Sequence, residues 1–152
     1  SENLVLREYG KPPFANHSII NKAAIRKNAA EKMKQYQVRA SGKSGIDTLV
    51  KLLSGGNQQK IVIAKWLNSN PKIFMFDEPT AGVDIVAKGE IISIIREFAD
   101  KGGAVIFASS ELAEMMAICD DIITIFDGKI TGRIGRKELM KEEELQHAIQ
   151  RK

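Results

Sequence analysis

The segment "KIFMFDEPT", Lys72–Thr80, joins a short apolar run to two consecutive carboxylates. A continuous apolar run of this length is typical of a buried strand in a parallel sheet. Asp77 and Glu78 then stand at the carboxyl end of the strand, where open α/β sheets bind their ligands. Asp77 can hold a Mg²⁺ ion, usually through its water, and Glu78 can orient or deprotonate an attacking water. A strand that merely ends in solvated acids is the alternative, and this segment alone leaves both open.

The residues after this segment alternate between helical and extended patterns. We expect a helix over 84–103, a second buried strand over 104–110, a short helix over 111–120, two strands over 122–134 and a charged helix over 136–150. Asp127-Gly128 is a tight hairpin signal between the last two strands. Strand, helix, strand, helix and strand in this order require a parallel sheet with right-handed crossovers.

The residues before this segment have helical patterns. Ile19, Ala23, Arg26 and Ala30 recur at three- and four-residue steps and predict a helix over 18–37. A short helix over 46–53 and a longer one over 57–70 follow, with a glycine pair between them and Pro71 as the stop. We therefore expect an α/β fold, with a helical region over 1–53 and an α/β region over 54–152.

The composition is that of a soluble globular protein. The chain has 152 residues, of which 43% are hydrophobic and 28% are charged, so one domain with a real core is expected. The single cysteine excludes an internal disulfide and fits a reducing compartment. No apolar stretch approaches the ~18 residues of a membrane span. The first residues have no basic region followed by an apolar run, so we expect no signal peptide.

The charge is unevenly distributed. Residues 1–60 hold 11 Lys and Arg against 4 Asp and Glu, whereas residues 61–152 hold 12 against 15. A basic region can attract nucleic acid or an anionic membrane. Its cations, however, have helical spacing and few aromatic residues between them to stack bases. We therefore interpret them as a solvated helix face and expect no nucleic-acid partner.

The segment "ASGKSGID", Ala40–Asp47, contains the Gly-Lys-Ser that ends a phosphate-binding loop G-x-x-x-x-G-K-[ST]. Its first glycine is absent, because Gln37 occupies that position. The preceding residues are also too polar for the buried strand that such a loop requires. We interpret the segment as a solvated turn between two helices.

The segment "LLSGGNQQK", 52–60, places Ser54, Gly55 and Gly56 immediately before a helix. Exposed N–H groups of a first helical turn, with two residues that lack side chains, make an anion site. An ordinary serine N-cap with a glycine hinge is the alternative, and taken alone it is the simpler one.

Together these segments resemble the ATP-binding-cassette (ABC) ATPases. "LSGGNQQ" resembles the signature motif of that family, "IFMFDEPT" its Walker B strand, and "AGVD", Ala81–Asp84, its D-loop. "NQQK", "KWLNSNPK" and "SSELAE" are similar to the second cassette of bacterial ATPases that import ribose, galactose and related sugars or nucleosides. The fold implied is a helical subdomain followed by part of a RecA-like P-loop NTPase lobe, with a mostly parallel sheet and a C-terminal hairpin.

The resemblance implies a role for each matching residue. Asp77 is then the Mg²⁺ residue, Glu78 the catalytic base, and Asp84 a residue of the dimer seam. The cofactors implied are ATP and Mg²⁺. The signature residues are implied to bind ATP held by the opposite cassette; they are Ser54, Gly55, Gly56, Asn57 and Gln58.

Two positions depart from the common family pattern. Asn57 replaces the more frequent glutamine, which keeps an amide and is usual in the sugar-uptake branch. Ser110 in "ASSELAE" occupies the position of the switch histidine. Serine lacks the long imidazole donor to a γ-phosphate oxygen.

The resemblance also implies partners, location and activity. A second cassette and a transmembrane permease are direct partners, and an extracellular binding protein is an indirect one, at the cytoplasmic face of the cell membrane. The chain resembles the C-terminal part of a cassette without its phosphate-binding loop, so we expect the full protein to hydrolyse ATP and this fragment to be inactive. The alternatives are a soluble ABC ATPase of DNA repair or translation, and a non-catalytic interaction module.

Overall fold

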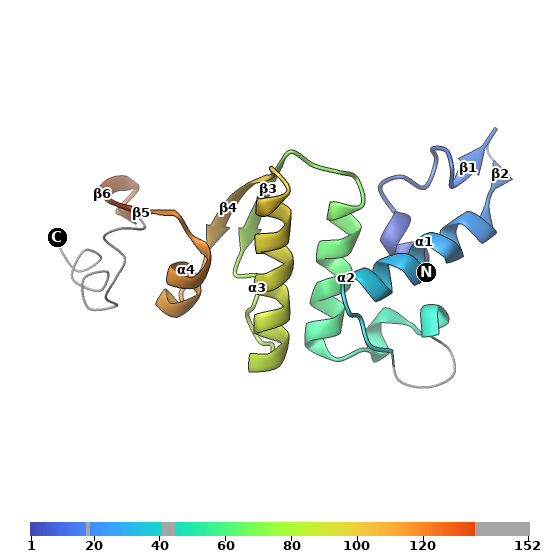
Figure 1. Ribbon diagram of the computed structural model, residues 1–152, viewed down its shortest axis with the longest axis horizontal. Coiled ribbons are helices and arrows are strands. Elements are labelled where there is room, and N and C mark those ends of the chain that lie inside the picture. The colour runs from blue at the N-terminus through green and yellow to red at the C-terminus, as the bar shows by residue number, and fades with distance from the viewer. Residues whose placement is uncertain (18, 41–44, 136–152) are drawn as a thin grey trace.

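The computed structural model describes residues 1–17, 19–40 and 45–135. Its elements follow one another along an elongated body, from the N-terminal helices through a central α/β unit to a β-hairpin (Figure 1). Helices and strands are mixed as the sequence predicts, so the α/β class is confirmed.

The N-terminal part contains the 3₁₀ helix η1 (Glu2–Val5), the short antiparallel strands β1 (Ala15–Asn16) and β2 (Ile19–Ile20), and helix α1 (Lys22–Gln35). The predicted helix over 18–37 is present but begins later. Asn21 caps it, because its Oδ1 accepts a hydrogen bond from the Ala24 backbone N–H at 3.0 Å.

The segment between α1 and the next long helix differs from the prediction. A short helix was expected over 46–53, but the chain forms two 3₁₀ turns, η2 (Gly45–Asp47) and η3 (Val50–Leu52). Leu49 between them is extended, with φ −64° and ψ 132°, which interrupts any continuous helix. Helix α2 (Gly55–Leu67) then includes the glycine pair in its first turn. Four residues of "ASGKSGID", 41–44, lie outside the described residues.

The central unit contains strand β3 (Ile73–Asp77), helix α3 (Ile85–Asp100), strand β4 (Ala104–Ala108) and helix α4 (Leu112–Ile118). The two strands are parallel, in register from Ile73 opposite Ala104 to Asp77 opposite Ala108. The predicted parallel pairing is confirmed, and both strands end at the same edge.

Strands β5 (Asp121–Phe126) and β6 (Lys129–Gly135) form the predicted hairpin. Asp127 and Gly128 have φ angles of 49° and 72°, which a two-residue hairpin turn requires. Within the described residues β5 pairs only with β6, so the expectation that it extends the parallel sheet is wrong. The predicted charged helix over 136–150 lies outside the described residues.

The parallel pair is covered on one face only. Phe74, Phe76, Val105 and Phe107 pack into the main core with the buried isoleucines of α3. The opposite face is apolar and open, with Ile73, Met75 and Ile106 being 63%, 72% and 54% exposed. The expectation of fully buried strands is therefore wrong for this structure, because α3 covers only one side of the pair.

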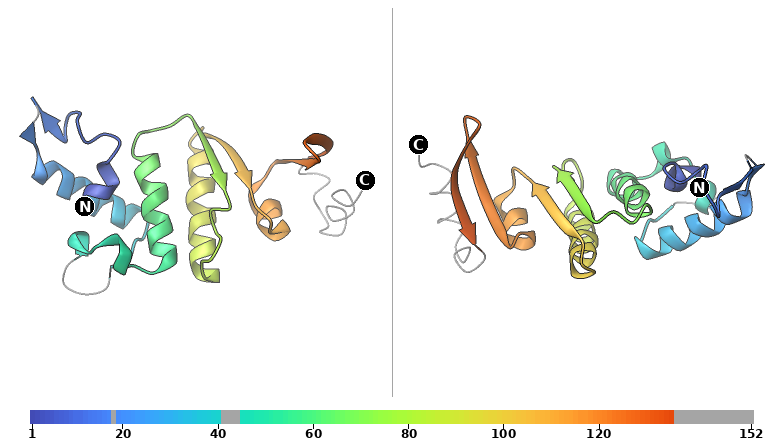
Figure 2. Two further views of the ribbon diagram at one scale, coloured as in Figure 1. Left: turned by 180° about the vertical axis from the view of Figure 1, so that it is seen from behind. Right: turned by 90° about the horizontal axis from the view of Figure 1, so that it is seen from above.

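Helices α2 and α3 lie side by side in the views of Figures 1 and 2. Their N-termini lie next to each other on one side of the body, since Gly56 of α2 lies against Ala87 of α3. Strands β3 and β4 point toward this same side of the body, the lower side in Figure 1, so the segments that contain the sequence-predicted site residues lie along it.

Candidate functional site

The N-terminus of α2 is fixed by its own side chains. Ser54 is the N-cap residue, but its side chain makes no capping hydrogen bond to the helix. Its Oγ instead accepts from Asn57 Nδ2 at 2.9 Å, and Asn57 Oδ1 accepts from the Arg39 backbone N–H at 2.9 Å. The N–H groups of the first turn are therefore not capped by Ser54, which suits an anion site.

Gln58 has a local structural contact. Its Nε2 donates to the backbone oxygen of Leu53 at 2.8 Å, so the side chain reaches back across the N-terminus of the helix. This contact braces the turn before α2 and leaves the Gln58 amide oxygen as its remaining polar atom.

The two signature glycines have different surroundings. A Cβ atom on Gly55 would lie 3.7 Å from the backbone oxygen of Gly82, an ordinary contact. A Cβ atom on Gly56 would lie 2.3 Å from the Ala87 Cβ, which is a steric overlap. Gly56 therefore allows α2 and α3 to approach each other, whereas Gly55 has room for a methyl group.

Gly56→Ala is expected to lower the free energy of unfolding by about 1–3 kcal/mol, because both clashing Cβ atoms are anchored to helix backbones. Gly55→Ala is the matched control and is expected to be neutral or slightly stabilising, since alanine favours the helix. Urea unfolding followed by circular dichroism measures both. Equal destabilisation by the two variants would contradict the close approach at Gly56.

Asp84 begins helix α3. Its Oδ1 accepts from the Ala87 backbone N–H at 2.9 Å, which makes it the N-cap residue. Its capping role follows from a general rule for aspartate before a helix, but the sequence interpretation considered only a dimer seam. One carboxylate oxygen of Asp84 thus stabilises the N-terminus of α3.

Glu78 is held by the loop after the neighbouring strand. Its Oε1 accepts from the Ser110 backbone N–H at 2.6 Å, and its own backbone N–H donates to the Ala108 oxygen at 2.9 Å. The backbone at Glu78 is left-handed, with φ 46°. The structure therefore brings together two sequence-predicted residues, with Ser110 contributing its backbone amide.

Asp77 is exposed at the end of β3. Within residues 1–17, 19–40 and 45–135, no group of three or more His, Cys, Asp or Glu side chains is arranged to hold a metal. Mg²⁺ at nucleotide sites is commonly held by one or two carboxylates together with substrate phosphates. Asp77 beside Glu78 fits that donor set, with the remaining ligands coming from the nucleotide and water.

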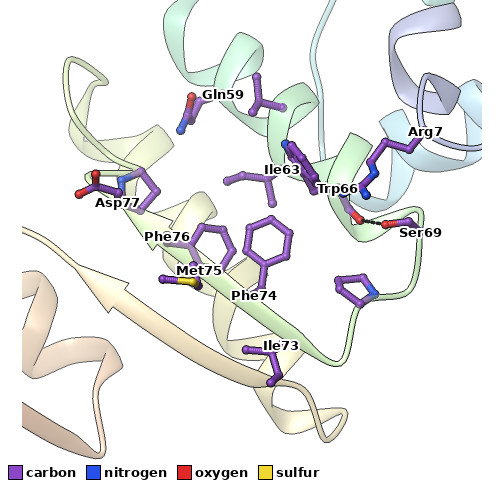
Figure 3. A pocket seen from close by; sticks show the side chains of 13 residues that line it. Arg7, Gln59, Ile63, Trp66, Ser69, Ile73, Phe74, Met75, Phe76 and Asp77 are labelled. Atoms are coloured by element: carbon purple, nitrogen blue, oxygen red, sulfur yellow. Dashed lines mark hydrogen bonds between the residues drawn. The ribbon is translucent and has the colours of Figure 1, made fainter.

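An apolar hollow of about 470 Å³ lies between α2 and β3 (Figure 3). Ile63 and Trp66 of α2 face Phe74 of β3 across it, and Asp77 lies at one end. The Arg7 guanidinium stacks on the Trp66 ring, 4.3 Å from its centroid.

A buried ion pair links α2 to α3. Lys60 is 2% exposed, and its Nζ lies 2.7 Å from Glu90 Oε2 and 2.7 Å from the Gln37 backbone oxygen. Arg39 binds the other oxygen of Glu90 at 3.1 Å. Sequence reasoning missed this pair, because two charged residues on separate helices give no local pattern.

The buried carboxylate of Glu114 was also missed. Glu114 of α4 accepts hydrogen bonds from Thr80 Oγ1 at 2.6 Å and from Ser109 Oγ at 2.8 Å. These donors follow β3 and β4, next to Glu78 and Ser110. A glutamate at a buried helical position was the available signal.

Comparison with known proteins defines the class of this chain. Residues 3–81, more than half of it, match the sequence profile of the family described as "ABC transporter". The chain therefore belongs to the ABC transporter family of ATP-binding proteins.

Its relatives include sugar import proteins. The chain is 45% identical over 141 residues to the ribose import ATP-binding protein RbsA of Bacillus cereus, covering 93% of the chain and 27% of that protein. It is 42% identical over 141 residues to the xylose import ATP-binding protein XylG of Thermoanaerobacter pseudethanolicus, again covering 93% and 27%. The chain thus spans about a quarter of the length of these relatives.

Solved cassettes share its fold. An ATP-binding cassette of an ABC transporter in its ADP conformation superposes with a TM-score of 0.72 at 23% identity, covering 98% of this chain and 61% of that one. A dimeric cassette bound to ADP and Pi gives a TM-score of 0.65 at 23% identity, covering 80% and 51%. The RecA-like P-loop fold class is confirmed.

Proposed function

We propose that this chain supplies the signature, Walker B and D-loop segments of a cassette that hydrolyses ATP to drive sugar import. The names of the relatives support this function, since RbsA is a ribose and XylG a xylose import ATP-binding protein. Residues 1–53 are then a helical subdomain, and residues 54–152 carry the signature helix and the C-terminal α/β part of the ATPase lobe. A nucleoside remains an alternative cargo.

The observation that carries the proposal is the hydrogen bond of 2.6 Å from the Ser110 amide to Glu78. It fixes one carboxylate oxygen and leaves the other to accept a proton from an attacking water. A general base acts when its free oxygen lies within hydrogen-bond reach of the proton that it removes, so a fixed carboxylate supports this role. Asp77 serves Mg²⁺, which supplies charge neutralisation at the phosphates when it is bound. Ser110 offers no imidazole to donate to a γ-phosphate oxygen, and Glu78 is the residue that accepts the proton.

The signature residues act on a second cassette. In the part of the chain that the structure describes, no hydrogen bond joins Ser54–Gln58 to Asp77 or Glu78. We infer that these two groups of residues belong to different half-sites, each of which is completed by the other cassette. The uncapped N–H groups of α2 then face the γ-phosphate of ATP bound by the opposite cassette. One solved cassette of the same fold is dimeric.

The hollow beside Trp66 and the open face of the parallel pair receive the rest of a cassette. Both surfaces are apolar, and Met75 is 72% exposed. An apolar surface of this kind is typical of an interface. The solved cassette in its ADP conformation is longer than this chain, which covers 61% of it. The chain alone is accordingly expected to lack ATPase activity and to bind Mg-ATP weakly.

Sugar import requires further partners besides the second cassette. A transmembrane permease binds the cassettes directly, and an extracellular binding protein delivers the cargo to the permease. None of the helices in the described ranges has the length and hydrophobicity of a membrane span. We place the cassette at the cytoplasmic face of the membrane, attached through its permease.

The function is tested with Gly55→Asp in a complete cassette that contains this chain. The side chain places a negative charge against the γ-phosphate across the dimer seam, so ATP turnover is expected to fall at least tenfold, about 1.4 kcal/mol in the barrier. The affinity for ATP is expected to change little, because the opposite cassette's phosphate-binding loop holds the nucleotide.

Gly55→Ala is the matched control and is expected to have a smaller effect, since a methyl group at this position makes only an ordinary contact with Gly82. Steady-state ATPase rates and nucleotide binding are measured on the same preparations. Normal turnover by Gly55→Asp would refute the signature assignment.

A further inference from the structure

Glu114 is a buried carboxylate at the end of the segment "SSELAE", and the sequence interpretation gives it no role. It lies in helix α4 and is 4% exposed. A buried carboxylate is costly unless its oxygens are paired. Glu114 is paired with groups from three different segments of the chain.

The three partners converge from the elements around the site. Oε2 accepts from Thr80 Oγ1 at 2.6 Å and from Ser109 Oγ at 2.8 Å. Oε1 lies 3.3 Å from the Nζ of Lys88. Thr80 belongs to the loop after β3, Ser109 to the loop after β4, and Lys88 to the first turns of α3, four residues after Asp84.

These contacts flank the bond that holds Glu78. Ser110, which donates its amide to Glu78 Oε1 at 2.6 Å, directly follows Ser109. Thr80 lies two residues after Glu78. The Ser109 hydroxyl also accepts from the Glu111 backbone N–H at 3.1 Å, which shapes the turn around Ser110. One carboxylate group therefore fixes both ends of the contact between Glu78 and Ser110.

The carboxylate is ionised at neutral pH. Burial alone raises the pKa of Glu114, but the hydrogen bonds from Thr80, Ser109 and Lys88 outweigh it, so that the pKa lies below its usual value. Oε2 accepts both hydroxyl bonds while Oε1 faces the Lys88 ammonium. A glutamine amide has one oxygen and one NH₂ group, so it would turn its NH₂ group either toward Lys88 or toward the two hydroxyls, and in both cases one set of contacts is lost.

We propose that Glu114 is a positioning residue for ATP hydrolysis, which holds the loops after β3 and β4 so that the Ser110 amide fixes the Glu78 carboxylate. This inference rests on the proposed function. Through Lys88 the same carboxylate also connects these loops to the helix that begins at Asp84. A purely structural role would make Glu114 matter for folding alone.

The test uses Glu114→Gln in the complete cassette. We expect kcat to fall about tenfold while KM for ATP stays within twofold, since nucleotide contacts are not altered and only the hold on Glu78 is loosened. Glu111→Gln is the matched control, because Glu111 also pairs with Lys88 but is exposed. It is expected to keep kcat within twofold. A fall in kcat accompanied by an equally large rise in KM would indicate general damage to the site and would overturn the proposal.

Thr80 supplies a second pair of variants, which decides the question even where Glu114→Gln folds poorly. Thr80→Ser keeps the hydroxyl donor and is expected to retain kcat within twofold. Thr80→Val removes the donor at similar size and is expected to lower kcat about fivefold at unchanged KM. Equal kcat for the two variants would overturn the positioning role.

The same measurements separate this proposal from the function on which it rests. Hydrolysis by the unaltered cassette together with full kcat in Glu114→Gln would refute only the positioning role. Absence of hydrolysis in the unaltered cassette would refute both.

Discussion

Glu78→Gln is expected to lower ATP turnover by a complete cassette at least 100-fold while ATP binding persists. General bases typically contribute about 10²–10⁴-fold to the rate. The glutamine oxygen can still accept the hydrogen bond that the Ser110 amide donates to Glu78 Oε1 at 2.6 Å. Geometry is thus kept and basicity is removed. Single-turnover hydrolysis and equilibrium nucleotide binding measure the two effects separately.

Glu97→Gln is the control for this substitution. Glu97 lies on the exposed side of α3. Among the ion pairs of the described residues, its one partner is Lys101, four residues along the helix. Its replacement is expected to leave turnover unchanged. If Glu78→Gln hydrolyses ATP as fast as Glu97→Gln, Glu78 is not the base.

Glu90→Ala is expected to lower the free energy of unfolding by about 3–5 kcal/mol, because it leaves a buried ammonium group without its counter-charge. Lys60 is 2% exposed and lies 2.7 Å from Glu90. Among the described residues, the Gln37 backbone oxygen, 2.7 Å away, would remain as its hydrogen-bond partner. The loss is measured as a shift of the urea unfolding midpoint at unchanged slope.

Glu97→Ala is the matched control on the same helix. Its pair with Lys101 is solvent-exposed, so the substitution is expected to cost less than about 1 kcal/mol. Both changes replace glutamate by alanine in α3, which cancels their effect on helix propensity. Similar losses in the two variants would show that the pair between Lys60 and Glu90 contributes no more than a surface contact.

Local patterns in the sequence predicted the elements well where a single segment determines its own structure. The run before Asp77 became β3, and Asp127-Gly128 became the hairpin turn, because both depend on neighbouring residues only. The interruption at Leu49 and the separation of β5 from the parallel pair were missed. The pairing of β5 depends on how distant segments pack, which a periodicity does not record.

The residues of the candidate site also fall into two groups, those that a local pattern predicted and those that it missed. Asp77 and Glu78 were found because a strand that ends in acids is visible in the sequence. The amide of Ser110 against Glu78 was not foreseen, since the sequence pointed to the Ser110 side chain and the structure shows a backbone contact. The contact between Glu114 and Thr80 and the pair between Lys60 and Glu90 were missed, because in each the two residues lie 30 or more positions apart along the chain.

The left-handed backbone at Glu78 has an energetic cost. With φ at 46°, this position suits glycine or asparagine, and a residue held there costs about 1–3 kcal/mol. The bonds to Ala108 and Ser110 compensate for that cost by anchoring both the backbone and the carboxylate of Glu78. Under the proposed function, these bonds hold the general base at a turn position that a glycine or asparagine would occupy with less strain.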